Sequence, residues 1–235
     1  MLSACTLPGR RERWASGDRT GTVTAHDVHG GDPQPVLQFD APVSALCELA
    51  GGLLAVGLQS GVVSIHAEVG ARGGFGGFER KRQYEHPDGT SVLVLAPLPG
   101  GGVASGGTGG SVMRLPARAA APESLVGHSS RIHAMLTLGG GGVLATASRD
   151  ATVRLWHGAG RIDVLQGHTG PVCALASLSQ ELLASGAADG AVRLWRGASC
   201  IRVLRGHAGV VSALAALPGR LLASADGQGA ICLWA

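Results

Sequence analysis

Residues 183–195 read LASGAADGAVRLW, and two other stretches repeat this text: LATASRDATVRLW at 144–156 and LASADGQGAICLW at 222–234. Each stretch ends in Trp, and the three Trp positions are 39 residues apart. A Gly-His pair stands before each stretch, with its His at positions 128, 168 and 207. Self-similarity at a fixed period of about 40 residues is typical of repeat architectures. The repeat is therefore the unit from which the fold is predicted.

Three weaker copies lie upstream, and they align on residues 183–195 without gaps. They read WASGDRTGTVTAH (14–26), LAVGLQSGVVSIH (54–66) and VASGGTGGSVMRL (103–115). The Trp position is occupied by His26, His66 and Leu115 in these copies. Six copies thus cover essentially the whole chain. We expect one domain, 1–235, with repeats at about 1–38, 39–84, 85–126, 127–166, 167–205 and 206–235.

The pattern inside each copy predicts about four short β-strands. ALASL (174–178) and ALAAL (213–217) are short apolar runs, as expected for strands that are buried on both faces. VRLW (192–195) alternates like a half-exposed strand, and Asp189-Gly190 favours a tight hairpin turn. Abundant glycine, 39 residues, and few aromatic side chains, 3%, agree with many short elements joined by turns. A single copy cannot bury both of its faces, so the copies are predicted to stack.

These residues resemble the WD40 repeat family, which combines a Gly-His pair and a Trp within a period of this length. The resemblance implies an all-β fold, a β-propeller with six recognisable blades. Trp is followed by His157, Arg196 and Ala235 rather than by the family's Asp. The family usually has seven blades, and here the last blade is expected to lack its outer strand. A six-bladed ring and part of a seven-bladed ring both stay open.

The family also implies a buried hydrogen-bonded set in each strong copy, made of the Gly-His histidine, a strand Ser or Thr, a turn Asp and the Trp. By position, the members are His128, Thr146, Asp150 and Trp156, then His168, Ser185, Asp189 and Trp195, then His207, Ser224 and Trp234. In the last copy Gln228 stands in the Asp position, and Asp226 comes two residues early. We therefore expect a rewired set there and a less rigid blade.

Enzymatic chemistry is not expected. The nine His show no ligand-like spacing, and neither a nucleophile elbow nor a phosphate-binding loop motif occurs, so no metal and no cofactor are predicted. The Ser/Thr, His and Asp groups are repeated and partnered by Trp, which favours a structural role over catalysis. Five scattered Cys suit a reducing compartment, and no apolar run is long enough to cross a bilayer. We expect a protein of the cytoplasm or nucleus.

A propeller without catalytic groups is typically a platform for other proteins or peptides. In the resembled family, partners often meet positions beside the Gly-His histidine and before the turn Asp. Mapped here, these candidate wide-face residues are Arg131, His133, Arg149, Pro171, Cys173, Ala188, Val210, Ser212, Gln59 and Ser91. A scaffold or adaptor in a multiprotein complex is the leading interpretation. Arg131 and Arg149 fit a carboxylate or phosphate.

Two alternatives remain open for the function. Residues 156–172 and 195–211 are similar to the propeller of phospholipase-activating, ubiquitin-binding WD-repeat proteins, which implies an adaptor for ubiquitin or for degradation substrates. An RNA- or chromatin-associated subunit would use the basic run 79–82 (ERKR) together with Arg131 and Arg149, although the net charge of only +3 makes nucleic acid a poor candidate. The Gly-rich insertion 70–77 is expected to be a flexible loop, followed by an outer strand around ERKRQ.

Overall fold

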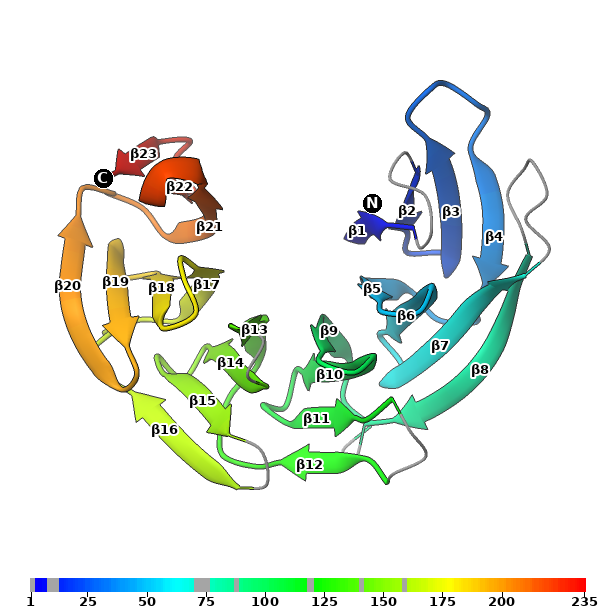
Figure 1. Ribbon diagram of the computed structural model, residues 1–235, viewed down its shortest axis with the longest axis horizontal. Coiled ribbons are helices and arrows are strands. Elements are labelled where there is room, and N and C mark those ends of the chain that lie inside the picture. The colour runs from blue at the N-terminus through cyan, green and yellow to red at the C-terminus, as the bar shows by residue number, and fades with distance from the viewer. Residues whose placement is uncertain are drawn as a thin grey trace. The chain divides into compact units, whose positions relative to one another are not determined.

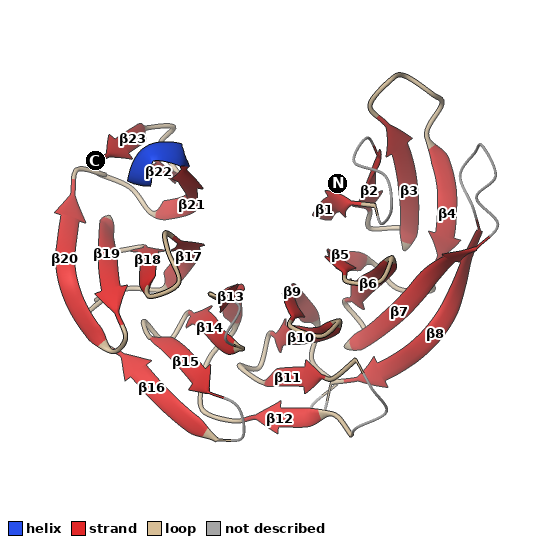
Figure 2. Ribbon diagram, viewed as in Figure 1, coloured by secondary structure: helices blue, strands red, loops and turns tan. Residues whose placement is uncertain are grey.

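Strands dominate the computed structural model, which describes residues 3–7, 13–69, 77–86, 89–117, 121–139, 142–157 and 160–235 (Figure 2). A single 3-10 turn, Pro218–Arg220, is the helical element of this described part. None of the described helical structure has the length and hydropathy that a membrane crossing requires. The chain divides into two compact units, Met1–Val126 and Gly127–Ala235. Most of the insertion 70–77 lies outside the described residues.

The described residues of the first unit form three antiparallel sheets of four strands each, and the strands of every sheet follow one another in chain order. They are β1 (Ser3–Thr6), β2 (Arg13–Gly17), β3 (Thr22–Asp27) and β4 (Gln34–Gln38); β5 (Val43–Leu49), β6 (Leu53–Leu58), β7 (Val62–Val69) and β8 (Gly77–Glu85); and β9 (Val92–Leu98), β10 (Gly102–Gly107), β11 (Val112–Leu115) and β12 (Glu123–Leu125). The ERKRQ run lies in β8, the outer strand of its sheet.

The second unit repeats the arrangement, but its last sheet has three strands within the described residues. The strands are β13 (Ile132–Leu138), β14 (Val143–Ser148), β15 (Val153–His157) and β16 (Arg161–Leu165); β17 (Val172–Ser177), β18 (Leu182–Ala187), β19 (Ala191–Arg196) and β20 (Ser199–Arg205); and β21 (Val211–Leu217), β22 (Leu221–Asp226) and β23 (Ile231–Trp234). The prediction of an all-β fold whose last sheet lacks an outer strand is confirmed.

The sheets of the second unit are held together face to face by apolar side chains. Val153 on β15 packs in one buried cluster with Val172 and Leu183 of the next sheet. In the same way Val192 on β19 packs with Val211 of the last sheet. Along this unit β13, β17 and β21 lie on one side, and β16 and β20 lie on the opposite side (Figure 1). Neighbouring sheets of this unit therefore bury their facing sides against each other.

Glycine in the second strand of a sheet allows the next sheet to approach closely. A Cβ placed on Gly186 would stand 2.5 Å from Cγ1 of Val211, which no real contact tolerates. The same relation recurs in the first unit, where a Cβ on Gly17 would stand 2.3 Å from Val43. These glycines have ordinary strand conformations, so they are required by packing rather than by backbone geometry.

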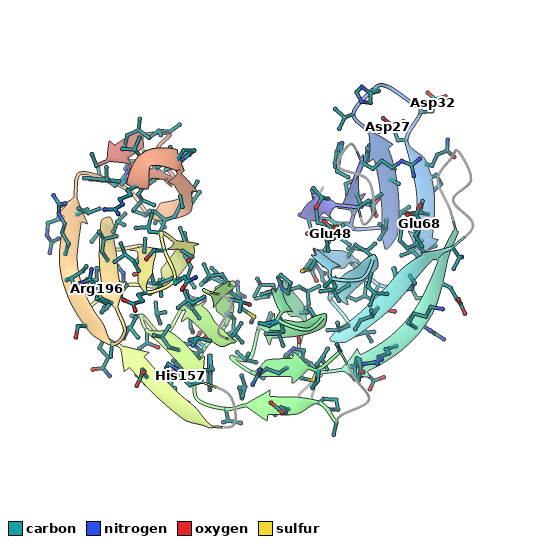
Figure 3. All side chains as sticks on the ribbon, in the orientation of Figure 1. Asp27, Asp32, Glu48, Glu68, His157 and Arg196 are labelled. Atoms are coloured by element: carbon teal, nitrogen blue, oxygen red, sulfur yellow. The ribbon has the colours of Figure 1, made fainter. Side chains whose placement is uncertain are left out.

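An ion-pair cluster ties the first and second sheets of the first unit together. Arg13 is buried and lies between two carboxylates, with 4.0 Å to Asp27 on β3 and 3.6 Å to Glu68 on β7. Figure 3 labels both acidic residues. A buried guanidinium needs such partners, because burying an unpaired charge is costly. The cluster therefore fixes β2 and β3 against β7.

Candidate protein-binding face

A four-membered hydrogen-bonded set closes one end of the sheet β13–β16. His128 Nδ1 lies 2.7 Å from Asp150 Oδ2, and its Nε2 lies 2.8 Å from Thr146 Oγ1. The indole N–H of Trp156 donates to the same Thr146 oxygen at 2.8 Å. An ionised carboxylate only accepts, so the neutral imidazole donates from Nδ1 and accepts the hydroxyl proton at Nε2. Burial is the main cause that lowers the pKa of His128, which keeps the ring neutral.

The next sheet contains the same set. His168 lies 2.9 Å from Asp189 Oδ2 and 2.8 Å from Ser185 Oγ, and Trp195 donates to Ser185 at 2.7 Å. The backbone N–H groups of Thr169 and Ala191 also donate to the Asp189 carboxylate, at 3.0 Å each. The carboxylate thus joins the loop after Gly-His to the turn between β18 and β19. This end of the sheet is therefore cross-linked by side-chain and backbone hydrogen bonds.

The last sheet builds its set with a different carboxylate. His207 Nδ1 lies 3.0 Å from Asp226 Oδ2, Ser224 lies 2.6 Å from the other ring nitrogen, and Trp234 donates to Ser224 at 2.8 Å. Gln228, which stands in the expected Asp position, donates its backbone N–H to Asp226. The set therefore contains the same four kinds of group as the other two. The difference from the other two sets is that the carboxylate comes from Asp226, two residues before the position that the aspartate occupies in the other repeats.

One further set was missed in the sequence. In the first unit His86 bonds Ser105 at 2.9 Å and Ser111 at 3.0 Å. His86 stands six residues before the buried Val92, whereas the strong copies have four residues in this interval. The two extra residues hid the histidine from the repeat alignment. Ser105 aligns on Ser185 and was the signal that could have revealed it.

Two histidines replace Trp in the first two copies. His26 Nε2 lies 2.8 Å from Ser16 Oγ, which is the contact that Trp195 makes with Ser185. His66 bonds Ser64 at 2.8 Å instead. Burial, and after it the charge of Arg80, lowers the pKa of His66 to about 4. Both rings therefore serve the packing and hydrogen bonding of their sheets.

The Ser/Thr hydroxyls of these sets are inaccessible. Thr146 and Ser185 are fully buried, and each hydroxyl oxygen already accepts an indole N–H. A nucleophile must reach its substrate, and these hydroxyls are buried, although each one donates a hydrogen bond to a histidine. Within the described residues, no three His, Cys, Asp or Glu side chains gather in a way that could hold a metal ion.

Seven of the predicted wide-face residues lie in backbone-bonded pairs at one end of their own sheets, either with each other or with a residue outside the prediction. In every pair, the residue before the turn donates its backbone N–H to the carbonyl of the residue just ahead of the first strand. The pairs are Arg149 to Arg131 (3.0 Å), Ala188 to Pro171 (2.8 Å), Gly227 to Val210 (3.0 Å), and in the first unit Gln59 to Pro42 (3.0 Å) and Thr108 to Ser91 (3.0 Å). Residues 17 or 18 positions apart in sequence therefore lie side by side at the rim of their own sheet.

A bulge near the start of the first strand turns a further residue toward this rim. The register shifts between Ile132 and Ala134, which leaves His133 as the extra residue. The same shift leaves Cys173 and Ser212 as extra residues in the next two sheets. Bulges commonly re-aim a side chain beside a functional surface. The bulged position and the backbone-bonded pair together define the rim.

Three basic side chains meet on the rim of sheet β13–β16. Arg131, His133 and Arg149 are all exposed. Desolvation of the ring, and then the charges of Arg131 and Arg149, lower the pKa of His133 below its usual 6.5. His133 is therefore neutral at pH 7, and the positive charge comes from the two guanidiniums. We call Arg131, His133 and Arg149 the basic rim cluster.

The remaining rim positions are small or already engaged. Pro171, Cys173 and Ala188 are half-buried, and Val210 and Ser212 are exposed without charge. In the first unit Gln59 is exposed, but Ser91 donates its hydroxyl to the Gln59 carbonyl at 2.7 Å. Ser91 therefore holds two neighbouring sheets together. Among the predicted wide-face residues, the charged side chains are therefore those of the basic rim cluster in the second unit.

The fold and its repeated buried sets define a repeat protein of stacked antiparallel sheets, the class of β-propellers. The family model described as "WD domain, G-beta repeat" matches residues 122–157, 160–196 and 198–235. The chain belongs to the WD40-repeat β-propeller family. None of the curated proteins compared with it matches at a significant level.

Solved structures share this fold at low sequence identity. Chaetomium thermophilum Sqt1 bound to the N-terminus of ribosomal protein L10 has a TM-score of 0.86 and 18% identity, over 99% of this chain and 71% of that chain. The WD40 propeller domain of Doa1 has a TM-score of 0.78 and 19% identity, over 100% and 78%. The computationally designed protein Ika8 has 0.80 and 23%, over 98% and 70%. At such identities the likeness concerns the fold alone.

Proposed function

We propose that this protein is a non-catalytic scaffold, and that its basic rim cluster binds an acidic segment of a partner protein. The observation that carries the proposal is the meeting of two exposed guanidiniums, Arg131 and Arg149, on a frame held by buried hydrogen bonds. The WD40 fold typically mediates protein interactions, and Sqt1, a structural neighbour, is bound to a peptide segment of another protein. The neighbour's own partner is not carried over to this chain.

The chemistry of the cluster favours carboxylates. A guanidinium forms two parallel hydrogen bonds with one carboxylate, which gives direction as well as strength. The backbone bond between Arg149 and Arg131 keeps the two side chains on one rim, so an acidic segment meets both without ordering a loop first. His133 between them is neutral at pH 7 and adds a hydrogen-bonding ring.

The test uses labelled peptides rich in Asp and Glu and fluorescence polarisation with the whole chain. We expect saturable binding that the double variant Arg131→Glu/Arg149→Glu weakens by about tenfold or more, because two charge-assisted contacts become repulsive. The matched control is Arg202→Glu/Arg205→Glu, which makes the same charge change at two exposed residues of the outer strand β20. An equal loss in both double variants would contradict the proposal, since it would show a response to net charge alone.

The two alternative functions give different results in the same assay. A ubiquitin-pathway adaptor would bind ubiquitin itself, which we add as a separate ligand. A nucleic-acid subunit would bind RNA or DNA with a steep dependence on salt. The basic run on β8 offers little for this purpose, because Lys81 pairs with Glu79 and Arg82 donates to the Pro116 carbonyl.

A further inference from the structure

A cavity lies at the end of the second unit's sheets that is opposite to the basic rim cluster. The rim is formed at the turns β14–β15 and β18–β19, and the turns β13–β14 and β17–β18 lie at the other end because the strands are antiparallel. At this other end a cavity of about 380 Å³ opens between sheet β13–β16 and sheet β17–β20. A volume of this size is usual for a ligand site.

The wall of this cavity is apolar. It is formed by Leu138, Val143, Leu155, Leu183 and Trp195. The adjoining turn supplies no side chain to cover this wall, because positions 139–142 are all glycine. A Cβ on Gly139, whose φ is +51°, would stand 2.9 Å from the Cα of Gln180. The glycine turn therefore packs closely on the next sheet and leaves the apolar wall open.

Charged side chains stand at the mouth of the cavity. His157 and Arg196, which follow the Trp of their copies and are labelled in Figure 3, both line it, and so does Glu181. The imidazole of His157 is held by Asp163 at 2.8 Å. Within the described residues, the exposed side chains of Arg196 and Glu181 make neither an ion pair nor a hydrogen bond. These two charges are therefore available to a ligand.

A smaller cavity of about 280 Å³ adjoins the first, since Arg196 and Glu181 line both. It lies where sheet β17–β20 packs against the last sheet, and Leu178 supplies part of its apolar lining. Arg220, in the turn between β21 and β22, adds a second positive charge. Two guanidiniums face one carboxylate here, so the smaller cavity favours an anionic group.

Arg220 has a backbone conformation that is costly for its residue type. Its φ is +66°, and it is the residue just before the second strand of its sheet. In three other sheets the same place is taken by glycine with a φ of +75° to +89°, namely Gly52, Gly101 and Gly142. Glycine adopts this region without steric cost, and strained residues of other types cluster at functional sites. The strain therefore points to a role for the arginine side chain.

We propose that the two cavities form a docking groove for a partner protein segment in which a large apolar side chain is followed by acidic residues. The apolar side chain enters the larger cavity and packs against Leu155 and Trp195, and a carboxylate pairs with Arg196 and Arg220. A residue of an extended segment advances about 3.3 Å, so neighbouring residues reach adjoining cavities. The buried anchor supplies most of the affinity, and the guanidiniums fix the direction of the segment. This groove is a second interaction surface beyond the proposed function.

The experiment measures binding of the labelled peptide GSFEEGS to the whole chain by fluorescence polarisation. We expect saturable binding. A version with Ala for Phe loses the buried apolar contact, and a version with Gln for both Glu loses the charge-assisted contacts. Each version should therefore bind about tenfold more weakly. No binding, or equal binding of all three peptides, would overturn the proposal.

Variants of the protein locate the site. Arg196→Ala and Arg220→Gly should each weaken binding of GSFEEGS by about fivefold or more, and the matched control Arg202→Ala, which removes one exposed charge from β20, should leave it within about twofold. The double variant Arg131→Glu/Arg149→Glu should bind as the unmodified chain does. Loss of binding in that double variant alone would place the peptide on the basic rim cluster, which refutes the groove and supports the proposed function.

Arg220→Gly also separates binding from folding. Because glycine relieves the strained φ, the melting temperature should stay equal or rise while peptide binding falls. Unchanged binding by this variant would refute the role of Arg220. Sedimentation velocity and competition with phenylacetate test the other occupants. A dimer that Arg196→Ala dissociates, together with no peptide binding, would assign the groove to a second copy, and displacement of the peptide by an equal concentration of phenylacetate would assign it to a small acid; either result refutes the proposal.

Discussion

Asp226 Oδ2 lies 3.0 Å from His207 Nδ1, although Asp226 comes two residues earlier in its repeat than Asp189 does in the preceding one. Its other oxygen accepts the backbone N–H groups of Gln228 and Ala230. Asp18, at the same position of the first repeat, accepts from Thr20 and Thr22 in the same way. A carboxylate at either of these two positions of the repeat can therefore accept hydrogen bonds from the histidine and from the backbone of the turn.

We predict that Asp226→Ala destabilises the last sheet. The change leaves His207 and two turn N–H groups without their acceptor, and buried unpaired donors are costly. The expected result is a fall in melting temperature of roughly 5 °C. Gln228→Ala is the control, since the hydrogen bond from Gln228 to Asp226 comes from its backbone N–H, which the variant keeps. Differential scanning calorimetry of both variants decides the matter, and equal melting temperatures would contradict the assignment of Asp226.

The close approach at Gly186 leads to a second prediction. In Gly186→Ala the new methyl group meets the side chain of Val211, so the sheets must move apart, at a cost of about 1–3 kcal/mol in unfolding free energy. Gly227→Ala is the matched control, because no atom lies within 4 Å of its added Cβ. Urea unfolding measures both free energies. If the two variants have equal unfolding free energies, the close contact with Val211 does not explain why glycine is required at position 186.

Acid should weaken the first unit through His66. The folded pKa of this residue is about 4, below the usual 6.5, so the unfolded chain binds a proton that the folded chain refuses. The stabilisation is complete above pH 6.5 and is lost as pH falls toward about 4, by up to ~3 kcal/mol. His66→Phe should flatten the dependence of the urea midpoint on pH between 7.5 and 4.5.

The cavity of about 590 Å³ beside His66 leaves room for the phenyl ring. The buried His128 and His168 have lowered pKa values for the same main reason, so part of the slope will remain. The exposed His29, replaced by Gln, is the control and should keep the full slope. A His66→Phe protein as acid-sensitive as this control would refute the prediction.

Thiol reactivity should follow burial. Burial is the main cause that raises the pKa of Cys5 and Cys47 to about 12, and Cys200 is exposed. Since the thiolate is the reactive form, Cys200 should react fastest with Ellman's reagent under native conditions. Cys200→Ser should remove the fast phase. Persistence of that phase in the variant would show that another thiol is reached first.

Several features could be predicted from the sequence because their residues lie close together within one repeat. The hydrogen-bonded set of His168, Ser185, Asp189 and Trp195 spans fewer than thirty residues of one repeat, so its members recur at a constant spacing. The set of His86 escaped notice because two extra residues broke this spacing. Alignment by position finds contacts only while the intervals between their members stay equal.

The sequence by itself determined the repeat, the alternation that makes each copy a sheet, and the identity of the buried polar groups. Only the tertiary structure decided that Asp226 replaces the missing turn Asp, that Arg131 and Arg149 share one rim, and that His86 bonds Ser105. The physical reason is the same in each case. Period and polarity are written along the chain, whereas strand register, bulges and the burial of an edge depend on what lies beside each strand.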